Sequence, residues 1–228
     1  LARKASFSLG DYYGAEEMQN QIVANDESNA LSWMTRGSYR MMNGDYDKAL
    51  DDFKRAAAID TSNQTIKFNL ALNHLYRADT VAARDILFTN ISQAKGASAQ
   101  GESRIFLAGI LNKMGDSTQK ETAKQYLQET VAMYQQALSV NRSSATGYMW
   151  LGIALTELGE PDLALEYLQV ADFMEMRPFY VGMINLWLGK AYQDLGQNEK
   201  AREHFSKVLS VASADYHQRE ARTFLEQP

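Results

Sequence analysis

The residue types that perform catalysis or bind metals are few and scattered in this sequence. Its 228 residues include no cysteine, which excludes a disulfide, a thiolate metal site and a cysteine nucleophile. The three histidines, His74, His204 and His217, lie too far apart to form a local metal-binding motif. No stretch has the spacing of a serine nucleophile elbow, a glycine-rich phosphate loop or a His-Glu-x-x-His zinc motif. The sequence therefore predicts no catalytic residue, no metal and no cofactor, and hence no enzyme.

The charge of the chain argues against two classes of partner. Its 23 basic and 28 acidic residues give a net charge of -5, which disfavours generic binding to nucleic acids or anionic membranes. The acidic pairs Glu16-Glu17 and Asp51-Asp52 fall on predicted helix surfaces and are interpreted as solvated. No stretch of about 18 apolar residues is present, so direct membrane insertion of this segment is not expected. The expected partner is a protein or peptide, and the oligomeric state stays open.

The compartment also stays open. A fold without disulfides suits both the cytoplasm and the bacterial periplasm. The chain starts with Leu1 rather than methionine, which leaves room for an upstream signal, anchor or further domain.

A repeated spacing of small and bulky residues organises the chain. Steps of 7, 5, 4 and 3 residues connect Gly37, Gly44, Ala49, Phe53 and Ala56. The same steps connect Gly152, Gly159, Ala164, Leu168 and Ala171, and the first three connect Gly189, Gly196, Ala201 and Phe205. Apolar residues recur at helical spacing on both sides of a glycine break, so each copy predicts two antiparallel amphipathic helices. One such hairpin cannot bury its apolar face alone, so the copies must stack.

This pattern resembles the tetratricopeptide repeat family, whose 34-residue unit carries W-x2-L-G-x2-Y and then A-x3-F-x2-A. The best copy matches that motif at Trp33, Gly37, Ala49, Phe53 and Ala56. Arg36 and Arg40 replace the leucine and tyrosine of the motif. The resemblance implies an all-α fold, a right-handed superhelical solenoid of antiparallel helix pairs. It also gives His74 the slot that usually holds tyrosine, so packing between helices explains this histidine better than metal binding does.

The resemblance covers nearly the whole chain, which is expected to form a single solenoid over residues 1–228. Its expected segments are a partial N-terminal repeat at 1–26, repeats at 28–62 and 63–92, an irregular repeat at 102–141, repeats at 145–176 and 180–211, and a capping helix at 214–226. The irregular repeat contains 10 extra residues between Gly115 and Thr130. An unbroken helical stripe across this insertion includes Ala123, Tyr126 and Leu127, so a single helix from about Ser117 to Val140 is expected. The preceding helix is too short to cover the whole stripe, which leaves it to the long loop before that helix or to another molecule.

In this family the first helix of each repeat lines a concave surface. The resemblance therefore implies a partner-binding groove formed by Met34, Ser38, Met41, Phe68, Leu72, Phe106, Ile110, Lys113, Met149, Ile153 and Lys190. Apolar side chains dominate this set, and its flexible methionines suit adaptable binding. Phe68 and Phe106, in the middle repeats, are among the expected anchors, with Lys113 and Lys190 at the edges to take acidic residues of the partner. The alternative is that several of these side chains are core between repeats.

The function implied by the resemblance is a non-enzymatic scaffold that binds a peptide or helix in an apolar concave groove. The alternative is a regulatory or substrate-recruiting region of a larger enzyme or signalling protein. Family members that hold the C-terminal carboxylate of chaperones use lysine, asparagine and a basic pair at set positions. Met34 and Ser38 stand at two of these positions, and Ser103 and Leu107 at those of the basic pair. Only Asn69 matches, which argues against a chaperone-tail adaptor.

Overall fold

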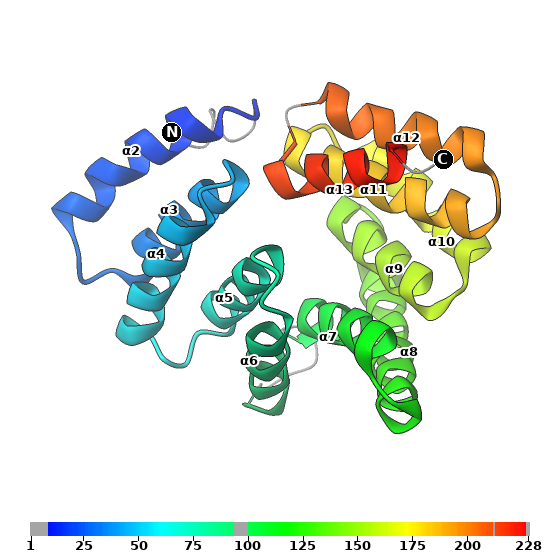
Figure 1. Ribbon diagram of the computed structural model, residues 1–228, viewed down its shortest axis with the longest axis horizontal. Helices are drawn as coiled ribbons and strands as arrows, with labels where there is room; N and C mark the ends of the chain where they lie inside the picture. Colours follow the sequence, from blue (N-terminus) through cyan, green and yellow to red (C-terminus); the bar gives the residue numbers. More distant parts are fainter. Residues whose placement is uncertain (1–8, 94–99, 212, 227–228) are drawn as a thin grey trace. The chain divides into compact units, whose positions relative to one another are not determined.

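The computed structural model describes residues 9–93, 100–211 and 213–226, and these residues form helices and turns without a strand (Figure 1). The helices are α2 (Tyr12–Asn25), α3 (Ala30–Met42), α4 (Tyr46–Ile59), α5 (Gln64–Tyr76), α6 (Thr80–Gln93), α7 (Gly101–Met114), α8 (Ser117–Val140), α9 (Ala145–Leu158), α10 (Pro161–Met174), α11 (Pro178–Asp194), α12 (Asn198–Ser210) and α13 (Asp215–Leu225). The predicted all-α fold is confirmed.

The described residues fall into two compact units. The N-terminal unit contains residues 9–93 and 214–216, and the C-terminal unit contains the others. In the N-terminal unit α3 packs on α4, α5 packs on α6, and α2 packs on α3. In the C-terminal unit the packed pairs are α7 with α8, α9 with α10 and α11 with α12. Short turns join the two helices of each pair, so the pairs are antiparallel, as the repeated spacing predicts. Of the expected partial repeat, residues 1–8 lie outside the described part of the chain.

Small residues allow the two helices of a pair to approach closely. Gly37 of α3 lies so near Phe53 of α4 that a methyl group on this glycine would be 2.9 Å from Cε1 of the ring. Gly152 of α9 contacts Leu168 of α10 in the same way. Phe53 and Leu168 are completely buried. The alternation of small and bulky residues in the repeat is therefore the contact between the helices of a pair.

Left-handed residues end the first helix of several pairs. Gly44 and Gly159 have φ angles of +86° and +82°, a region that glycine adopts without steric cost. Pro161 follows Gly159 as the first residue of α10, where its missing N–H removes no helical hydrogen bond. Ala78 has a φ of +61° in the turn between α5 and α6, so that turn has the same conformation without a glycine.

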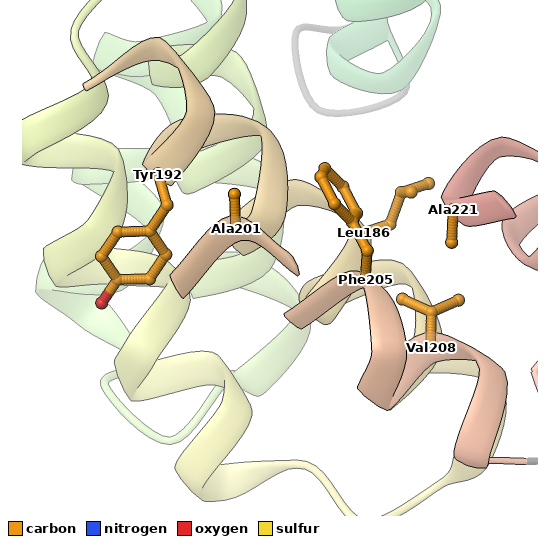
Figure 2. Close-up of a cluster of buried hydrophobic side chains, with 6 residues drawn as sticks. All are labelled: Leu186, Tyr192, Ala201, Phe205, Val208 and Ala221. Atoms are coloured by element: carbon orange, nitrogen blue, oxygen red, sulfur yellow. The ribbon is translucent and has the colours of Figure 1, made fainter. Parts of the chain in front are cut away.

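A compact hydrophobic cluster joins α11, α12 and α13 in the C-terminal unit. Figure 2 shows its six buried side chains, Leu186, Tyr192, Ala201, Phe205, Val208 and Ala221. Phe224 of α13 stacks on Phe205 with ring centroids 4.7 Å apart. The last helix therefore covers apolar side chains of the preceding pair.

The insertion lengthens α8, as predicted. This helix spans Ser117–Val140 without a break, and it begins with a capping box. The Asp116 side chain accepts a hydrogen bond from the backbone N–H of Gln119, and the Gln119 side chain accepts one from the backbone N–H of Asp116. These two bonds satisfy amide groups that the first turn leaves without helical partners.

The chain itself buries two of the three side chains named for the apolar stripe of α8. Ala123 and Leu127 are 0% and 1% exposed, and α7 packs along α8. The guanidinium of Arg104, on α7, lies 5.9 Å from the centre of the Tyr126 ring. Ala123 and Leu127 are therefore covered within the unit, whereas Tyr126 is half-buried.

Candidate partner-binding surface

The N-terminal unit contains five of the eleven residues expected to form the groove. Met34, Ser38 and Met41 lie on α3, and Phe68 and Leu72 lie on α5, which packs beside α3. Met41, Phe68 and Leu72 are buried, with exposed fractions of 2%, 9% and 8%. Met34 and Ser38 are half-buried. In this unit the groove side chains that a partner can reach are therefore Met34 and Ser38.

The C-terminal unit contains the other six, on three first helices of which α9 packs beside both α7 and α11. Met149 and Ile153 are completely buried and Ile110 is nearly so. Phe106 and Lys190 are half-buried, and Lys113 is exposed. Burial of the aliphatic members of the set fits the alternative that part of it is core between repeats.

The two lysines have different surroundings. Lys190 Nζ lies 2.7 Å from Glu220 Oε1 and 4.0 Å from the centre of the Trp187 ring, so its charge is bound within the unit. Lys113 forms no ion pair among the described residues. Of the two, only Lys113 is positioned to meet an acidic group of a partner.

Carboxylates that the sequence interpretation did not single out lie on the same first helices. Glu157 of α9 lies against Gly109 of α7. Burial raises the pKa of Glu157, although the charges of Lys190 and Lys113 oppose this effect. Burial also raises the pKa of Asp194, and the charge of Lys190 again acts in the opposite direction. The C-terminal parts of these first helices therefore carry charges of both signs.

The N-terminal half of α7 carries an acid and an aromatic ring. Glu102 lies in the first turn of α7, and burial raises its pKa. Phe106 follows four residues later on the same face of the helix. Its ring meets Trp150 of α9 edge to face, with centroids 6.3 Å apart. The four-residue spacing of Glu102 and Phe106 is visible in the sequence, whereas the contact with Trp150 is not.

An ion-pair network in the N-terminal unit corrects the interpretation of the acidic pairs. Arg36 donates two hydrogen bonds to Asp52, at 2.9 and 2.8 Å, and Arg40 donates a third at 2.9 Å. Arg40 also donates to Glu16 at 3.0 Å. Asp52 is 2% exposed and the side chain of Glu16 is 14% exposed, so describing these two acids as solvated is wrong. The network connects α2, α3 and α4 through the arginines that depart from the family motif.

The histidines lie in separate packing environments. Burial, helped by the charge of Lys190, lowers the pKa of His217 to about 3. His204 Nδ1 is 2.8 Å from Asn185 Oδ1 and its ring stacks on Tyr192. His74 Nδ1 lies 3.1 Å from Asp79 Oδ2. Within the described ranges no three histidine or acidic side chains form a group that could hold a metal ion, and no helix is long and apolar enough to cross a membrane.

Three models of known protein families match the chain, and all three describe the same kind of repeat. Three family models, each described as a tetratricopeptide repeat, match residues 30–63, 127–180 and 184–215. Together these matches span more than half of the chain. A search of curated proteins finds no match.

Solved structures with a similar fold include several repeat proteins. A thermophilic tetratricopeptide repeat protein of Thermus thermophilus has a TM-score of 0.59 at 22% identity, covering 87% of this chain and 100% of that one. The Cut9-Hcn1 hetero-tetramer of the APC/C gives 0.61 at 16% identity, over 91% of this chain and 38% of that one. The human IFIT1 dimer with m7Gppp-AAAA gives 0.58 at 15% identity, over 88% and 46%. These likenesses show the fold.

Proposed function

The chain belongs to the tetratricopeptide repeat family, and we propose that it is a non-enzymatic scaffold that holds a peptide or helix of another protein against its first helices. Stacked helical repeats present extended faces that suit this task. Proteins or peptides are accordingly the expected class of partner.

The observation that carries this proposal is the accessible aromatic surface on the first helices of the C-terminal unit. Phe106 and Trp150 are both half-buried and lie edge to face on α7 and α9, with the exposed Lys113 two turns after Phe106. Aromatic side chains that are partly covered but reachable are typical anchors of protein interfaces. In the N-terminal unit Met34 offers a smaller and more adaptable apolar contact.

Nucleic acid is not the proposed ligand. The net charge of -5 opposes binding to a phosphate backbone. The likeness to human IFIT1, solved with m7Gppp-AAAA, is a likeness of fold at 15% identity. An electrophoretic shift assay with single-stranded RNA at physiological salt tests this part of the proposal, and submicromolar binding would contradict it.

Selection from a displayed library of random twelve-residue peptides tests the main proposal. We expect the purified protein to enrich peptides that bind the C-terminal unit, and Phe106→Ala to weaken their binding by about tenfold or more. Fluorescence anisotropy with one enriched, labelled peptide measures the affinity.

Phe173→Ala is the matched control. Phe173 is 90% exposed near the end of α10, a second helix, so removing its ring should leave the affinity unchanged. Circular dichroism should show the same helix content for both variants. Failure to enrich any peptide, or equal effects of the two substitutions, would contradict the proposed binding surface.

A further inference from the structure

Glu102 has an unusual environment for a carboxylate on the partner-binding surface. It is half-buried, and it has no hydrogen bond or ion pair among the described residues. Burial raises its pKa, and no cation among the described residues opposes this effect. The N-terminal position on α7 favours a negative charge but supplies no counterion. Within the described part of the chain this carboxylate has no counterion, so a cation of a bound partner would be stabilised there.

The arginines of the neighbouring segments are already bound elsewhere. Arg104 lies two residues after Glu102, on a different face of α7, and its Nη2 is 3.3 Å from Glu129 Oε2. Arg177 Nε donates to Glu175 Oε1 at 2.8 Å, and its guanidinium lies 4.2 Å from the centre of the Tyr180 ring. Neither side chain compensates Glu102.

Aromatic side chains occupy positions near Glu102 on α7 and on the helices packed against it. Phe106 is one helical turn further along α7 and contacts Trp150 edge to face. The hydroxyl of Tyr134 lies against Gly101, the residue before Glu102. Burial raises the pKa of Tyr180, the charge of Arg177 opposes this, and the charges of Glu175 and Glu102 add to it. A carboxylate beside aromatic faces is a combination that binds cations through both charge and ring contacts.

The charges on the first helices of the C-terminal unit also favour a positively charged partner. Three carboxylates on α7, α9 and α11 form no ion pair among the described residues, namely Glu102, Glu157 and Asp194. Of the three cations on these helices, Arg104 and Lys190 have ion-pair partners, and Lys113 has none among the described residues. A bound segment that carries positive charge is therefore electrostatically complementary to this surface.

We propose that Glu102, Phe106 and Trp150 receive an arginine side chain of the bound partner segment. A planar guanidinium can donate two parallel hydrogen bonds to the carboxylate while its face contacts an aromatic ring. A lysine would supply the charge without this fit. The inference rests on the proposed function, since it assigns one residue of the same bound segment.

Three immobilised libraries of random twelve-residue peptides test this inference. Their sixth residue is fixed as arginine, glutamine or glutamate, and no other position contains lysine or arginine. We expect half-saturation of the arginine library at a protein concentration about tenfold lower than for the glutamine library. The glutamate library should bind most weakly.

Two charge-removing variants separate the site from the general charge of the protein. Glu102→Gln keeps the shape of the side chain and should abolish the preference for arginine over glutamine. Glu166→Gln removes an exposed acid from α10 and should preserve it. Carboxyl carbon NMR supplies a second measurement, since an arginine peptide taken from the library should lower the pKa of Glu102.

The outcomes distinguish this inference from the function on which it rests. Peptide binding without a preference for arginine, or a preference that survives Glu102→Gln, would overturn the arginine site alone. Failure of all three libraries to bind would overturn the proposed function together with the site.

Discussion

Replacing Asp52 with asparagine should destabilise the N-terminal unit strongly. The Asp52 carboxylate is 2% exposed and accepts three hydrogen bonds, two from Arg36 and one from Arg40. Asparagine has nearly the same shape, but it removes the negative charge and replaces one acceptor oxygen with a donor. Two guanidinium groups that are 13% and 16% exposed then lose their shared counterion.

The size of the expected loss in stability depends on the interactions that the two arginines keep. Breaking a buried ion pair by removing one partner typically costs about 3–5 kcal/mol. Arg40 keeps Glu16 and Arg36 keeps a hydrogen bond to Asn20 at 3.2 Å, and both arginines retain some contact with water. We therefore expect a loss at the lower end of that range, about 3 kcal/mol.

Urea unfolding followed by hydrogen exchange of the amides in α3 and α4 measures this loss in the unit concerned. Asp51→Asn is the matched control, because Asp51 is exposed and the change should cost less than about 0.5 kcal/mol. Arg36→Leu, which restores the residue of the family motif, should recover part of the stability when it is combined with Asp52→Asn. Equal effects of Asp52→Asn and Asp51→Asn would refute the structural role of the network.

Two further predictions concern the packing and the pH dependence. Phe53→Ala should lower the free energy of unfolding of the N-terminal unit by about 3–5 kcal/mol, because the ring is completely buried against Gly37. A loss below about 1 kcal/mol in urea titration would contradict this contact. His217 should lower the stability of the C-terminal unit as the pH decreases from about 6.5 toward 3, since the unfolded chain binds a proton at this residue in that range and the folded unit does not. The raised pKa values of Glu102, Glu157 and Asp194 act in the opposite direction. His217→Gln should reduce this slope, and identical pH profiles of the two proteins would contradict the assignment.

The helix pairs could be predicted because their determinants are local. The glycine breaks at Gly44 and Gly159 and the helical spacing of apolar residues are properties of consecutive residues. The extent of α8 followed from the same periodicity, which continues through the insertion. Helix existence and pairing therefore need little information from distant segments.

Burial of the expected groove residues could not be predicted in this way. Position on a first helix places Met149 and Met34 on equivalent faces, yet Met149 is completely buried and Met34 is half-buried. How far neighbouring first helices cover one another depends on the packing of several pairs. The spacing within one repeat does not contain this information.

The sequence by itself determined the repeat, its small and bulky contact positions and the all-α fold, because backbone geometry converts residue spacing directly into helix faces. Only the tertiary structure decided which charges are partners. Arg36 meets Asp52 across 16 residues, and Lys190 meets Glu220 on another helix, whereas Glu102 has no ion pair among the described residues. Ion pairing depends on distances and burial between helices, and these arise when the pairs pack against one another.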